Sequence, residues 1–128
     1  METWYQVTVL SVGGSLGVNA RYWLGVAITQ WVGPRFPWAT FAINVSGSFA
    51  IGLLTMLLSR WLPHPHARLL VVVGFLGGYT TFSSFSLEAM TLWERGETWS
   101  CLGYIFGSVA AGLAAVVLGA AVGRVLAR

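Results

Sequence analysis

The 128-residue sequence has little charge and almost no cysteine. Charged residues make up only 9% of the chain, whereas a soluble domain carries about 25%. Hydrophobic residues make up 56%, and a chain this short cannot bury so much apolar surface in a water-soluble core. A soluble enzyme, a nucleic-acid-binding protein and a disordered chain are all disfavoured, and a single-domain integral membrane protein remains. The lone Cys101 excludes an intrachain disulfide and a cysteine-based zinc site.

Proline is scarce and confined to two places, where it marks loops between helices: Pro34 and Pro37, then Pro63 and Pro65. Six of the seven tryptophans lie at the borders of the long apolar runs, as an interfacial belt would. We therefore expect one membrane domain, residues 1–128, with four spanning helices at about 5–31, 38–61, 67–93 and 99–124. The rival, a soluble helical bundle, needs a polar face on each helix, and residues 109–122 offer none.

The orientation of the four spans is left open by the charges. All seven basic residues are arginines, and they are dispersed. Four spans would place Arg60, Arg68, Arg124 and Arg128 on one side of the membrane and Arg35 and Arg95 on the other. Because this bias is weak, insertion in both orientations and a fixed topology with cytoplasmic termini both remain.

Small residues indicate close helix contacts. Four pairs of glycines have the small-xxx-small spacing: Gly13 with Gly17, Gly74 with Gly78, Gly103 with Gly107, and Gly119 with Gly123. With 16 glycines in the chain, several such pairs are expected by chance, so the spacing identifies no particular interface.

Two polar side chains interrupt the first two spans. Arg21 lies inside the first span, where it would line a wet vestibule, pair with another group, or snorkel to the interface. Asn44 lies within the second span, and its amide would either serve a functional site or join two helices by hydrogen bonds.

The third span contains the densest polar run. Residues 77–86 combine two adjacent glycines, five serines and threonines, and two phenylalanines. Glycine costs a helix about 1 kcal/mol, so this run predicts a break near the middle of the span, with a kink as the alternative. Broken helices in membranes are buried in protein or line a cavity, and a break frees carbonyl oxygens that suit a hard cation.

Three side chains follow the break at intervals of three residues, roughly on one helical face: Phe82, Phe85 and Glu88. Glu88 is the only acid within the spans proper and is a candidate counter-charge to Arg21. In the fourth span, Tyr104 and Ser108 are four residues apart and form a short polar stripe, or simply join helices.

The third-span sequence, residues 74–88, closely resembles the signature of the Fluc (CrcB) family of fluoride channels. Two further matches support the resemblance, one at residues 13–17 followed by Arg21 and one at residues 44–47. Length and layout match as well, so the resemblance covers the whole chain. The family commonly has threonine where this chain has Ser84, and the hydroxyl is kept.

The resemblance implies an all-α membrane protein that assembles as an antiparallel, dual-topology homodimer with two pores. It also implies a central structural sodium ion on the two-fold axis, held by backbone carbonyls of Gly77 and Thr80 from both subunits. The implied pore residues are Phe82, Phe85, Asn44, Tyr104, Ser108, Thr81, Ser84 and Glu88, with Arg21 at the wide vestibule. The family often has another hydroxyl one turn after Ser108, where this chain has Gly112.

The expected function is therefore a fluoride-selective channel, not an enzyme, that passively exports fluoride through the bacterial inner membrane and lowers its toxicity. One rival is a proton-coupled small-multidrug exporter. Such a pump needs an intramembrane carboxylate, and the first span holds Arg21 and no acid, which argues against this rival. Another rival is a membrane adaptor that transports nothing and only assembles with partners. That function would not explain a broken, hydroxyl-rich helix.

Overall fold

The computed structural model describes residues 2–128, apart from the side chain of Glu2. These residues form helices and short connections, with no β-strand among them. The elements in chain order are α1 (Glu2–Val32), α2 (Trp38–Trp61), α3 (Pro65–Arg68), η1 (Leu69–Leu76), α4 (Gly77–Tyr79), α5 (Phe82–Glu94) and α6 (Thr98–Leu126). The four helical stretches begin and end within three residues of the ranges expected from the sequence.

Three of these stretches are long and apolar enough to cross a membrane: Trp38–Trp61, Pro65–Glu94 and Thr98–Leu126. α1 is equally long, but within the described residues it does not reach the same apolarity, because Asn19 and Arg21 interrupt it. The fold class is thus an all-α membrane protein, and the fourth span stays a prediction.

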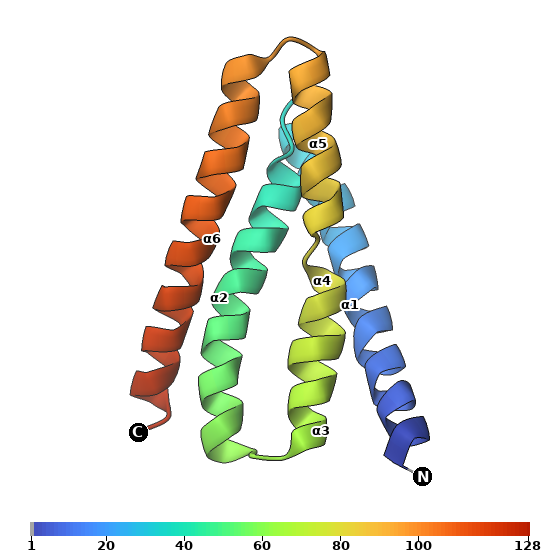
Figure 1. Ribbon diagram of the computed structural model, residues 1–128, viewed down its shortest axis with the longest axis vertical. Coiled ribbons are helices and arrows are strands. Elements are labelled where there is room, and N and C mark those ends of the chain that lie inside the picture. The colour runs from blue at the N-terminus through green and yellow to red at the C-terminus, as the bar shows by residue number, and fades with distance from the viewer. Residues whose placement is uncertain (1) are drawn as a thin grey trace.

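The helices pack as two close pairs, α2 with α6 and α1 with η1 and α4 (Figure 1). Glycine makes both pairings possible. A Cβ at Gly78 would lie 2.6 Å from the Gly14 carbonyl oxygen, and one at Gly123 would lie 2.8 Å from the Leu53 carbonyl oxygen. Of the four glycine pairs, Gly103 and Gly107 meet no atom within 4 Å, so only three contribute to packing within the described chain.

The third helix is broken near its middle, as expected (Figure 1). Thr80 and Thr81 have extended backbone, with φ/ψ of −80°/157° and −151°/117°. The reason inferred from the sequence was wrong, because Gly77 and Gly78 are both helical. The break instead follows them, and the preceding π-helical stretch, η1, was not foreseen.

Candidate functional site

The side chain of Asn44 binds the backbone at the break in the third helix. Its side-chain Oδ1 accepts a hydrogen bond from the Thr81 backbone N–H at 2.8 Å, and its Nδ2 donates to the Thr81 carbonyl oxygen at 3.0 Å. In a continuous helix, the Thr81 N–H would donate to the Gly77 carbonyl. A side-chain amide from α2 therefore replaces the helical partner of both peptide groups of Thr81, which would otherwise be unsatisfied away from water.

Thr81 also starts the helix after the break. It is buried, and its hydroxyl caps the N-terminus of α5 by accepting from the Ser84 backbone N–H at 3.2 Å. The same hydroxyl donates to Ser84 Oγ at 3.1 Å. A threonine at this position satisfies one of the free N–H groups of a helix start, so α5 begins at Phe82.

Glu88 is held by two hydroxyl groups from other helices. The Thr40 hydroxyl of α2 donates to Oε1 at 2.8 Å, and the Tyr104 hydroxyl of α6 donates to Oε2 at 2.7 Å. Tyr104 is only 1% exposed, and its ring lies 5.1 Å from that of Phe85. Thr40 was missed in the sequence, although its place one turn before Asn44 puts both on one face of α2.

Arg21 does not pair with Glu88. Its Nη1 instead donates to the Thr80 carbonyl oxygen at 3.4 Å, from α1 across to the break. Both Arg21 and Glu88 line a cavity of about 580 Å³, together with Thr40, Thr81 and Ser84. The predicted counter-charge is thus replaced by a backbone carbonyl, and the guanidinium lies at the wall of an open cavity.

A second cavity, of about 370 Å³, lies on the other side of Thr81. It brings together five of the predicted pore residues: Asn44, Thr81, Phe82, Phe85 and Ser108. The Phe82 and Phe85 rings lie 5.5 Å apart at 42°. Ser108 Oγ is buried and has no hydrogen-bond partner among residues 2–128. Such an unpartnered group calls for an explanation, and a ligand is one.

The predicted residues do not all lie in one place. Tyr104 binds Glu88, whereas Ser108 lines the second cavity. The two residues of the predicted polar stripe on α6 therefore lie in different surroundings. Phe85 is buried, but Phe82 is 78% exposed on the outside of the single chain. Ser48 lines the second cavity too, and its Oγ is 3.5 Å from where a Gly112 Cβ would be.

Of the two predicted sodium ligands, Gly77 lies just before the break and Thr80 lies within it. Gly77 lines the second cavity and loses its helical donor, because the Thr81 N–H is bound to Asn44. Within the described part of the chain, the one hydrogen bond to the Thr80 carbonyl is the long contact with Arg21, at 3.4 Å. These carbonyl oxygens fit the donor chemistry of a hard cation such as sodium.

Comparison with known proteins identifies the family. The family model described as "CrcB-like protein, Camphor Resistance (CrcB)" matches residues 8–120. A relative from Solibacter usitatus is 53% identical over 117 residues, covering 91% of this chain and 96% of its own. Relatives from Nitrobacter winogradskyi and Rhizobium etli are 44% and 46% identical, covering 96% and 95% of this chain and 98% of their own.

All three relatives carry the name "Fluoride-specific ion channel FluC". The resemblance found in residues 74–88 is thereby confirmed, and so is the expectation that the chain is not an enzyme. Three helices of spanning length, in a family of bacterial channels, make it a multi-pass protein of the bacterial inner membrane. The chain belongs to the CrcB-like family.

Proposed function

We propose that this protein is a fluoride channel, and that it lets accumulated fluoride leave the cytoplasm passively. The observation that carries the proposal is the cavity beside the break, which two phenylalanines and Asn44 line together with Ser108, whose hydroxyl has no partner among residues 2–128. The names of the relatives support the same ion. The direction of flow follows the fluoride gradient, because a channel has no energy source of its own.

The lining suits a small, strongly hydrated anion. Fluoride enters a pore only when protein donors replace part of its water shell. The Ser108 hydroxyl has no partner among the described residues and can donate, while α2 supplies the Asn44 amide at the break and α6 supplies the Tyr104 hydroxyl beside Glu88. The Phe82 and Phe85 rings carry a positive edge that can meet an anion. Several weak sites in a row permit rapid transit.

The larger cavity would serve as the vestibule. Arg21 lies at its wall, with a positive charge inside the bundle that raises the local concentration of anions. Glu88 lines the same cavity, but each of its carboxylate oxygens accepts a hydrogen bond, one from Thr40 and one from Tyr104. These two donors reduce the negative potential that an entering anion would meet.

A second copy of the chain in antiparallel orientation would complete the channel. Gly77, Phe82, Ser83 and Ser86 are all exposed around the break, at mid-span of the third helix. Exposed polar groups and a broken helix are disfavoured against lipid, so this surface needs a protein partner. The weak arginine bias is compatible with insertion both ways, and each dimer would then hold two pores.

A sodium ion between the two breaks would fasten the subunits together. The carbonyl oxygens of Gly77 and Thr80 from each copy would bind it. This ion has a structural role only, so its removal should change the stability of the dimer. Thermal unfolding of the dimer in sodium, compared with N-methylglucamine, tests that role separately from transport.

The function is tested by efflux from liposomes that contain the purified protein. A fluoride electrode should record rapid release of fluoride, and chloride-loaded liposomes should release almost no chloride over the same time. A protonophore added to both sides should leave the fluoride rate unchanged, which separates a channel from a proton-coupled exporter. No release above that of protein-free liposomes would refute the proposal.

A further inference from the structure

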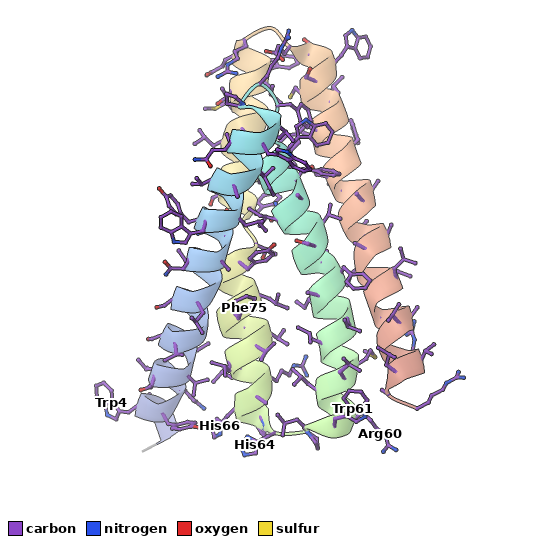
Figure 2. The ribbon with its side chains drawn as sticks, turned by 180° about the vertical axis from the view of Figure 1, so that it is seen from behind. Trp4, Arg60, Trp61, His64, His66 and Phe75 are labelled. Carbon is purple, nitrogen blue, oxygen red and sulfur yellow. The ribbon has the colours of Figure 1, made fainter. Side chains whose placement is uncertain are left out.

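A third cavity lies far from the break, at the end of the bundle where α2 meets α3 (Figure 2). It is a groove of about 420 Å³ under the loop between these helices. Its lining residues are Thr55, Leu58, Ser59, Leu62, Pro63, His64, Pro65 and Arg68. None of these residues belongs to the two cavities near the break, so the groove has no place in the proposed ion path.

The lining of the groove is amphipathic. Leu58 and Leu62 of the α2 end supply an apolar wall together with the two loop prolines. Arg68 and His64 line the same groove and are both exposed. A site with an apolar wall and a cationic rim suits a ligand that has an anionic head and an apolar tail.

His64 is arranged so that one ring nitrogen is free to donate. Its Nδ1 accepts a hydrogen bond from the His66 backbone N–H at 3.2 Å, which caps the start of α3. A neutral imidazole with Nδ1 as acceptor carries its proton on Nε2. Ser59 offers no comparable donor, because its hydroxyl already donates to the Thr55 carbonyl at 2.7 Å. The exposed donors of the groove are therefore Arg68 and His64, and the half-buried Thr55 hydroxyl is a further, neutral donor.

Two exposed tryptophans indicate that the groove lies near the lipid headgroups. Trp61 and Trp4 are strongly exposed at the same end of the molecule, where the aromatic belt of a membrane protein is found (Figure 2). Arg60 and Arg124 lie near the ends of α2 and α6, and Arg60 Nε donates to the Ala127 carbonyl at 3.2 Å. This basic end attracts anionic lipid rather than a zwitterionic one.

We propose that this groove binds one anionic phospholipid. Arg68 and the His64 Nε2–H would hold its phosphate, while the glycerol backbone and the first acyl carbons would lie along Leu58 and Leu62. Free phosphate has the same charge but leaves the leucine wall unused. The lining of the groove therefore favours a lipid over a dissolved anion.

The test is native mass spectrometry of the detergent-purified full chain with added phosphatidylglycerol or phosphatidylcholine. The protein should retain phosphatidylglycerol in preference. Arg68→Gln should weaken this binding about fivefold, because one basic residue near an anionic headgroup contributes about that much. The matched control is Arg124→Gln, which removes the same charge at the same end outside the groove.

A second variant separates binding from folding. His64→Asn keeps a side-chain oxygen that can cap α3 but removes the Nε2–H donor. It should also lower phosphatidylglycerol binding, at an unchanged unfolding temperature. Equal loss in Arg68→Gln and Arg124→Gln would mean unspecific charge attraction and would overturn the proposal. Displacement of the lipid by millimolar glycerol 3-phosphate would do the same, since it would identify a phosphate site without a lipid requirement.

Discussion

Replacing Gly17 with alanine should loosen the contact between α1 and the third helix. A Cβ at Gly17 would overlap the Phe75 carbonyl oxygen and lie 2.9 Å from both the Phe75 carbonyl carbon and the Tyr79 amide nitrogen. Ordinary contacts begin at 3.4 Å, so the helices would have to separate by more than about half an ångström. The obstructing atoms belong to the backbone, and no side-chain rotation relieves the overlap.

The cost of this substitution should be large for a single methyl group. Overpacking typically costs about 1–3 kcal/mol, and a gap of about 0.5–1 Å forfeits a quarter to a half of each pairwise dispersion contact. Helix association in a membrane depends on such packing, because lipid supplies no hydrophobic driving force between helices. We therefore expect a loss of about 3 kcal/mol in the free energy of unfolding, at the upper end of the overpacking range. Tyr79 directly precedes the break, so fluoride transport should fall as well.

The matched control is Gly14→Ala, on the same helix, where an added Cβ meets no atom within 4 Å. Thermal unfolding of the purified protein in detergent should show a midpoint about 10 °C lower for Gly17→Ala, and a nearly unchanged one for Gly14→Ala. If the two variants unfold at the same temperature and conduct equally, the close approach of α1 to Phe75 is not a feature of the folded protein.

Three predictions concern the second cavity, and each is measured by fluoride-electrode efflux together with size-exclusion chromatography. Phe82→Ile and Phe85→Ile should each strongly reduce flux while the assembly persists, because isoleucine has no positive ring edge; wild-type rates in both would contradict the pore assignment. Asn44→Asp should impair flux, because a carboxylate repels the anion and loses the donation to the Thr81 carbonyl; unchanged flux at neutral pH would count against it. Ser108→Ala should slow flux without loss of stability, since its hydroxyl has no partner among residues 2–128; a destabilised protein would reveal a structural bond instead.

The helices were predictable because their signals are local. Long apolar runs form helices, and the prolines and tryptophans that end them stand in the sequence itself. α2 occupies the expected range, Trp38–Trp61, at both ends. The position of the break was less accessible, because both glycines that suggested it are helical; Gly78 admits the Gly14 backbone, and a Cβ at Gly77 would meet no atom within 4 Å.

The partners of the polar side chains could not be read from the sequence. Asn44 had two interpretations there, and only the structure shows that both ends of its amide bind Thr81. Thr40 drew no notice, since a threonine on an apolar helix commonly bonds its own backbone. Its true partner, Glu88, is 48 residues away, and that distance is bridged only by tertiary packing.

The pairing of the donors suggests how an anion would pass without being trapped. The Asn44 amide is bound to Thr81, and the Tyr104 hydroxyl is bound to Glu88. Within the described residues, Ser108 alone offers an uncommitted buried hydroxyl. An anion at Ser108 would therefore gain one new bond, and one at Asn44 could use the second N–H of the amide, whereas an anion at Tyr104 would have to replace the Glu88 carboxylate as the acceptor. Because each position would offer only one or two donors, no single site would replace the whole water shell of the anion, and binding would stay weak enough for conduction.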